Sequence, residues 1–131
     1  MPSTNPLRVG AIVALTLATA YIHATLGGLL YMLNAIGYLV LAAAVLLSAV
    51  APHPVARRFA WLTRLGLAGY AGVTIVGYLV LGPYFVLGWV TKAIELVLVG
   101  LICVDLLITY RGPTGLLREA ARSLGLERRL S

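Results

Sequence analysis

The chain has 131 residues, of which 61% are hydrophobic and only 11% are charged. Soluble proteins are about half apolar and about a quarter charged. This composition therefore excludes a disordered chain, a nucleic-acid-binding domain with a charged surface and an ordinary cytosolic enzyme. The mean hydropathy of +0.99 points the same way. We predict an all-α integral membrane protein that folds as one small helical bundle in the lipid bilayer.

Four apolar segments are each long enough to cross the roughly 30 Å hydrocarbon layer of a membrane. In chain order they run from about Leu7 to Leu26, Leu33 to Val50, Phe59 to Leu81 and Phe85 to Tyr110. Each break between them has a chemical cause, because glycine weakens a helix and proline cannot continue one. The sequence therefore predicts a four-helix membrane bundle over residues 1–111, followed by a tail over residues 112–131.

The breaks between the segments differ in how sharply they are marked. Prolines mark two of them, at Pro52 and Pro54 and at Gly82-Pro83, and Gly112-Pro113 ends the fourth segment in the same way. The first break depends on Gly27-Gly28 alone, and the stretch 27–33 contains neither a charge nor a proline. We expect this stretch to be either a tight turn at the membrane surface or a short re-entrant piece.

The arginines predict how the bundle is oriented. They lie before the first segment, between or just inside the second and third, or after the fourth: Arg8, Arg57, Arg58, Arg64, Arg111, Arg118, Arg122, Arg128 and Arg129. The connections 27–33 and 82–84 carry no charge. Four spans place every arginine on one side of the membrane, which is a positive-inside pattern. We expect a multi-pass protein of a prokaryotic cell (inner) membrane with both termini in the cytoplasm.

The tail over residues 112–131 differs in kind from the spans. Thr114 is the expected N-cap of a short helix. Apolar residues recur at helical spacing at Leu116, Leu117, Ala120, Ala121 and Leu124, while Arg118, Glu119, Arg122 and Ser123 occupy the other face. We predict an amphipathic helix on the cytoplasmic membrane surface, in contact with anionic lipid. The alternative is a frayed tail.

Lys92 and Glu95 are the strongest functional signal, because charged side chains inside a span are costly and are usually paired or functional. A spacing of three residues places both on one helix face, where they can form an ion pair. Two interpretations stay open. The pair is either an internal contact that fixes packing or a site that meets a ligand, a proton or a partner subunit.

Other polar residues fall at the same depth when the four spans are laid out by topology. His23 lies near the outer end of the first span, Asn34 opens the second and Tyr78 lies near the outer end of the third. They can converge with Lys92 and Glu95 in the outer leaflet. Tyrosines at this depth also form the ordinary aromatic belt of membrane proteins, so we give them less weight.

His23 has several interpretations as a proton carrier, a structural histidine, or a haem or metal ligand. A single histidine does not make a bis-histidine haem site, and His53 lies in a loop on the opposite side. Haem ligation by one histidine and a quinone headgroup site remain alternatives, and we expect no metal site of protein ligands alone.

Near the inner ends of two spans, Arg64 and Asp105 can pair. The simpler expectation is a snorkelling Arg64 and a water-facing Asp105.

Three short stretches carry a resemblance to a known group of proteins. They are residues 23–27 (His-Ala-Thr-Leu-Gly), residues 31–39 around Leu-Asn-Ala-Ile-Gly-Tyr, and residues 88–96 around Lys-Ala-Ile-Glu. The chain resembles, over residues 8–110, small four-span membrane proteins of archaea and bacteria that share a histidine near the end of the first span and a Lys-x-x-Glu pair in the last. The resemblance implies a four-span architecture and no biochemical function.

No aqueous catalytic motif, such as G-x-S-x-G or H-E-x-x-H, occurs in the sequence, so an enzyme is not favoured. Three functional hypotheses remain. The first is an accessory or structural subunit of a larger membrane complex, including an electron-transfer complex. The second is a self-assembling proton or small-ion channel or carrier that uses Lys92, Glu95 and His23. The third is a haem, quinone or lipid binder in the outer-leaflet pocket. Expected partners are the lipid bilayer, other membrane subunits or further copies of the chain, and no nucleic acid.

Overall fold

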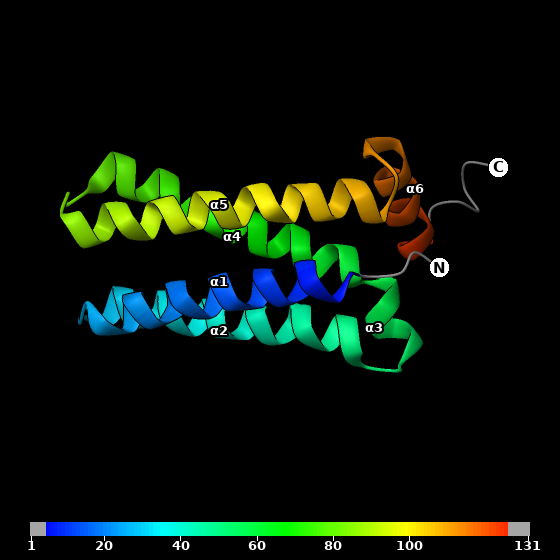
Figure 1. The fold of residues 1–131 in the computed structure, drawn as a ribbon, viewed down its shortest axis with the longest axis horizontal. Helices are drawn as coiled ribbons and strands as arrows, with labels where there is room; N and C mark the ends of the chain where they lie inside the picture. Colours follow the sequence, from blue (N-terminus) through cyan, green and yellow to red (C-terminus); the bar gives the residue numbers. More distant parts are fainter. Residues whose placement is uncertain (1–4, 126–131) are drawn as a thin grey trace.

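A computed structural model describes residues 5–125, and this part of the chain is helical throughout apart from short connections. The helices are α1 (Pro6–Thr25), α2 (Leu29–Val50), α3 (Pro54–Arg58), α4 (Ala60–Leu81), α5 (Val86–Thr109) and α6 (Pro113–Ser123). Figure 1 shows the four long helices lying side by side and antiparallel along the chain, with α3 and α6 at the end where α1 begins. The all-α prediction is confirmed.

The long helices form a closed four-membered ring. Helix α1 packs against α2 and α5, and α4 packs against the same two helices. The interior is filled by fully buried apolar side chains from all four helices, namely Ile12, Val45, Leu67, Leu98 and Ile102. Most other large apolar side chains face outward. Helices α1, α2 and α4 are long and apolar enough to cross a membrane, and a fourth span is counted when α5 and α6 are taken together.

The connection between α1 and α2 is a tight turn. Gly27 and Gly28 have φ angles of 75° and 88°, a region that only glycine enters without strain. Helix α2 begins at Leu29, so most of the stretch 27–33 is helical and the re-entrant alternative is wrong. The two glycines alone reverse the chain, because they give the backbone a conformation that no other residue type here adopts readily.

Helix α3 is a short helix in the loop that the sequence marked only by its prolines. Pro54 stands at its first turn, where the missing N–H costs nothing. The ring of His53 caps it by accepting a hydrogen bond from the Val55 amide at 3.2 Å. His53 is exposed, as expected, but it also starts a helix. The same prolines therefore end one helix and begin the next.

Helix α6 packs across the end of the bundle where α1 begins and makes an angle of 79° with α5. Its N-cap is Gly112, with a φ of 94° and no side-chain cap, so the prediction that Thr114 is the N-cap is wrong. Ser123, expected on the solvated face, is buried and accepts a hydrogen bond from the Trp61 indole at 3.1 Å. Leu117 and Leu124 remain exposed. The amphipathic helix is present, and its polar edge holds it to α4. Arg128 and Arg129 lie outside the described residues.

Candidate functional site

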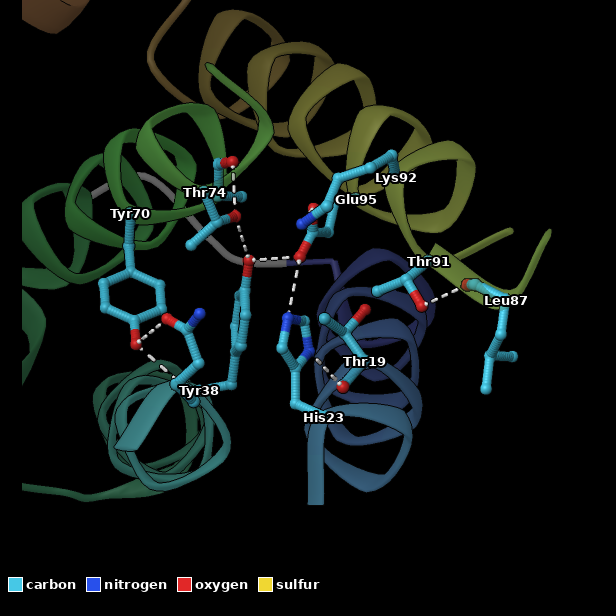
Figure 2. Close-up of polar contacts among 11 residues, drawn as sticks. Thr19, His23, Tyr38, Tyr70, Thr74, Leu87, Thr91, Lys92 and Glu95 are labelled. Atoms are coloured by element: carbon cyan, nitrogen blue, oxygen red, sulfur yellow. Dashed lines mark hydrogen bonds and ion pairs between the residues drawn. The ribbon is translucent and has the colours of Figure 1, made fainter. Parts of the chain in front are cut away.

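The Glu95 carboxylate is the centre of a buried polar cluster that joins three helices. Lys92, one turn earlier on α5, donates to Oε2 at 2.7 Å. The Tyr38 hydroxyl from α2 donates to Oε1 at 2.9 Å. His23 from α1 places Nε2 at 3.8 Å from the same oxygen. Figure 2 shows the Tyr38 and His23 rings side by side, both directed at Glu95. Glu95 and Tyr38 are fully buried.

Lys92 lies at the edge of the cluster, with a side chain that is 11% exposed. The expected Lys92–Glu95 pair is present at the helical spacing that brings two such residues onto one face. The Lys92 ammonium also lies 5.4 Å from the centroid of the Tyr78 ring, where the negative face of the ring attracts it. One side chain therefore links the buried carboxylate to the outer part of the bundle.

Tyr38 connects Glu95 to the fourth helix. Its hydroxyl lies 2.9 Å from the Thr74 hydroxyl on α4. Its ring packs edge to face against Tyr70, with centroids 4.8 Å apart. Gly37 makes room for this arrangement, because a Cβ there would collide with the Tyr70 hydroxyl. All four long helices thus contribute polar atoms to one network.

His23 is held in a defined tautomer by its own helix. Its Nδ1 lies 2.8 Å from the Thr19 carbonyl oxygen. A carbonyl only accepts hydrogen bonds, so Nδ1 carries the proton in the neutral ring, an assignment made from the hydrogen-bond network. The neutral ring then presents the Nε2 lone pair to the Glu95 carboxylate. Two acceptors face each other unless a further proton lies between them.

The structure separates the five predicted site residues into an inner and an outer set. His23, Lys92 and Glu95 meet. Asn34 instead accepts a hydrogen bond from the Tyr70 hydroxyl at 2.9 Å, one step away from the cluster. The Tyr78 hydroxyl accepts a hydrogen bond from the Phe85 amide at 3.1 Å, so it supports the α4–α5 connection and reaches the cluster only through Lys92.

Sequence reasoning missed Tyr38 and Thr74. Tyr38 is one of the tyrosines that the sequence assigns to the aromatic belt. It follows Asn34 by four residues, however, and therefore shares its helix face. It also lies well inside α2 rather than at its end. Depth within the apolar run was the available signal, because belt tyrosines belong at the ends of a span. Nothing in the sequence marks Thr74.

A second buried cluster surrounds Asp105, near the end of the bundle where α1 begins. Arg64 donates through Nε to Oδ2 at 2.8 Å, and Arg8 donates through Nε to Oδ1 at 2.7 Å. Arg64 also donates to the Ala60 carbonyl at 2.9 Å. Both Arg64 and Asp105 are fully buried, so they do not reach water separately as the simpler expectation had it. Arg8, which the sequence linked only to orientation, is the third member.

A layer of apolar side chains separates the two clusters. Glu95 and Asp105 are ten residues apart on α5, which is about 15 Å along a helix. Leu98 and Ile102 lie between them on the same face, fully buried against Val45 and the other interior residues. Thr16, a buried polar side chain on α1 between Arg8 and His23, donates to the Ile12 carbonyl of its own helix and is bonded to neither cluster among the described residues.

The surroundings of His23 do not fit a haem iron. Nδ1 is bonded to the Thr19 carbonyl, and Nε2 faces Glu95 3.8 Å away. Neither nitrogen is therefore presented to an open coordination position. Within residues 5–125, no group of three or more His, Cys, Asp or Glu side chains could hold a metal ion.

No family model, curated protein or solved structure matches this chain.

Proposed function

We propose that the chain is an integral protein of the cell (inner) membrane with both termini in the cytoplasm. The distribution of charge over the fold supports this orientation. Arg57 and Arg58 on α3 and Arg118 and Arg122 on α6 lie at the end where the chain begins. The turns at the other end, 26–28 and 82–85, carry no charged residue. Basic residues on one side are the pattern that retains a terminus in the cytoplasm.

We infer that this protein binds and releases a proton at the cluster of His23, Tyr38, Lys92 and Glu95. The main observation in support is that Nε2 of His23 and Oε1 of Glu95 face each other at 3.8 Å inside the bundle. Lys92 alone neutralises Glu95, so a purely structural pair needs no histidine. An imidazole at this place is buried, which disfavours its charged form, and faces a carboxylate that stabilises that form. Histidine is the side chain whose unperturbed protonation changes near neutral pH.

The apolar layer beneath the cluster restricts how a proton reaches it. Burying a charge among Leu98, Ile102 and Val45 without partners costs several kcal/mol at least. We therefore expect the site to exchange protons with the outer side of the membrane only. This favours a one-sided proton-linked site or carrier over a continuous pore through a single bundle.

Infrared difference spectra after a pH jump test the site directly. The protein is reconstituted in lipid nanodiscs, and the carboxyl and imidazole bands are recorded for the wild type and Glu95→Gln. We expect pH-dependent bands that disappear in Glu95→Gln and persist in Glu119→Gln, a control on α6 away from the cluster. Wild-type spectra that equal those of Glu95→Gln contradict the proposal and leave a structural ion pair.

Liposomes containing a pH-sensitive dye distinguish a one-sided site from a channel. With a proton gradient applied, we expect no sustained flux above that of protein-free liposomes. A sustained flux that Glu95→Gln abolishes is the result expected of a channel formed by several copies, and it contradicts one-sided access.

An accessory or structural subunit of a larger membrane complex is the second candidate, and it is compatible with a proton site. Gly66 and Gly69 support it, because both are exposed on α4 with open space beyond them. Small residues on a lipid-facing surface let another helix approach closely. Purification from native membranes in mild detergent, with mass and absorbance recorded together, tests this. Co-migration with different chains supports a subunit, and a colourless homo-oligomer opposes it.

A further inference from the structure

Thr19 departs from a pattern that most other helical threonines and serines of the described chain follow. In a helix, a buried threonine or serine usually donates to the carbonyl three or four residues earlier. Seven described residues do so: Thr16, Thr25, Ser48, Thr63, Thr74, Thr91 and Ser123. The Thr19 hydroxyl is completely buried and has no hydrogen-bond partner within the described chain. A carbonyl one turn away is within its reach, so its side chain points elsewhere.

The unpartnered hydroxyl lies beside the proton site. Thr19 precedes His23 by four residues and therefore shares its face of α1. In Figure 2 the Thr19 side chain lies next to the His23 ring, and its hydroxyl is directed toward α5, the helix that carries Glu95. Leaving a buried hydroxyl unbonded costs about 1–3 kcal/mol. The Thr19 hydroxyl, Nε2 of His23 and Oε1 of Glu95 thus lie in one part of the interior, between α1 and α5.

We propose that a single water molecule binds between Thr19, His23 and Glu95. The 3.8 Å between Nε2 and Oε1 is too long for a hydrogen bond, but one water oxygen can lie within bonding distance of both. Its two hydrogens satisfy the two acceptors, and its oxygen accepts the Thr19 proton. Three bonds are typical of a buried water. The site is enclosed by protein, because Thr19 and Glu95 are 0% and His23 is 2% exposed.

This inference rests on the proposed function, because it names how the proton is held. On uptake, the O–H bond of the bound water breaks as a new N–H bond forms at Nε2 of His23. A hydronium ion from outside returns one proton to the bound water, so the net change is one imidazole and one hydronium giving one imidazolium and one water. The imidazolium then donates through the water to Glu95.

The charged and titratable groups that face the site come from every neighbouring helix. Glu95 favours the imidazolium and Lys92, also on α5, opposes it. Tyr38 from α2 occupies Oε1 with its hydroxyl proton, and Thr74 from α4 is the alternative acceptor for that proton. Tyr70 packs behind Tyr38 without touching Glu95. Glu95 thus has a charged partner on one oxygen and shares the other with Tyr38 and the water.

Solid-state NMR in lipid bilayers tests the water. We expect cross-peaks from a slowly exchanging water to the His23 ring and the Thr19 methyl in the wild type. Thr19→Val, which has nearly the same shape, loses the His23 cross-peak, and Thr19→Ser keeps it. Thr16→Val is the matched control, because Thr16 is equally buried but donates to the Ile12 carbonyl. A wild type without the cross-peak, or Thr19→Val with it, overturns the inference.

Unfolding measurements give a second test, because the effect of Thr19→Val on stability has opposite signs with and without a bound water. If the hydroxyl holds a water, Thr19→Val lowers stability and Thr19→Ser restores it. If the hydroxyl has no partner, Thr19→Val is neutral or stabilising, and the inference fails. A water cross-peak without the pH-dependent infrared bands retains the hydration site and rejects the proton function. The bands without the cross-peak reject the water alone.

Discussion

The two charge clusters of this bundle are equally buried, but they differ in chemistry. Glu95 is paired with a lysine, a tyrosine and a histidine, and histidine is the side chain whose protonation changes near neutral pH. Asp105 is paired with Arg64 and Arg8, and guanidinium groups keep their charge in proteins. The Asp105 cluster also engages both carboxylate oxygens with guanidinium nitrogens at 2.7 and 2.8 Å. We therefore interpret it as a lock between α1, α4 and α5.

The comparison shows why burial of a charge does not by itself indicate function. Both carboxylates are fully buried. The Asp105 cluster ties three helices together, and the Glu95 network draws on all four long helices. Only the Glu95 cluster contains two acceptor atoms that face each other and an unpartnered hydroxyl nearby. The partners of a buried charge therefore decide whether it is a fixed contact or a responsive one.

Asp105→Asn is expected to have the largest effect. It leaves Arg64 and Arg8 beside a neutral amide, and an uncompensated buried charge costs about 3–5 kcal/mol. The midpoint and slope of unfolding in mixed micelles measure the loss, with Glu119→Gln as the control. A cost below about 1 kcal/mol, well under the range for a broken buried pair, contradicts the assignment of this cluster as a lock.

Glu95→Gln is the matched substitution in the other cluster, and its expected cost is smaller, about 1–3 kcal/mol. Lys92 is partly exposed, so its ammonium can turn toward the membrane surface when its partner is removed. The same unfolding assay compares the two variants. If Glu95→Gln costs as much as Asp105→Asn, both clusters are structural locks and the contrast between them disappears.

Gly37→Ala tests the packing that places Tyr38. The added methyl group collides with the Tyr70 hydroxyl, and overpacking of this kind costs about 1–3 kcal/mol. Gly69→Ala is the control, because open space surrounds that position. Near-UV circular dichroism of the tyrosines is expected to change in the first variant only. Equal spectra in both variants contradict this prediction and show that Tyr70 shifts to make room without moving Tyr38.

Ser123→Ala is expected to have the smallest effect, about 1 kcal/mol. It removes the hydrogen bond from the Trp61 indole and loosens α6 from the inner end of the bundle. Amide hydrogen exchange over residues 113–123 should speed up, while exchange in α1 and α2 stays unchanged. Thr114→Ala, which removes no cap, should leave exchange as in the wild type, and any increase there restores Thr114 as a capping residue.

The amino-acid sequence by itself determined the helical segments and the residues that stand out within them. Apolar length, proline breaks and the cost of a charge in a span are local properties, and they located Lys92, Glu95 and His23. The distribution of arginines likewise follows from the sequence alone. The short helix α3 was missed, because its five residues lie in a loop where prolines were considered only as helix breakers.

Only the tertiary structure decided which polar groups meet. Helices with apolar residues on every side have no strongly preferred rotation about their axes, so sequence spacing could not choose between Asn34 and Tyr38 as the partner of Glu95. The pairing of Arg8 with Asp105 spans nearly the whole chain, and no local pattern indicates it. The direction of the Thr19 hydroxyl is set by the χ1 rotamer of that side chain. Each of these features depends on packing between helices, which fixes rotation and side-chain direction only when all four are in place.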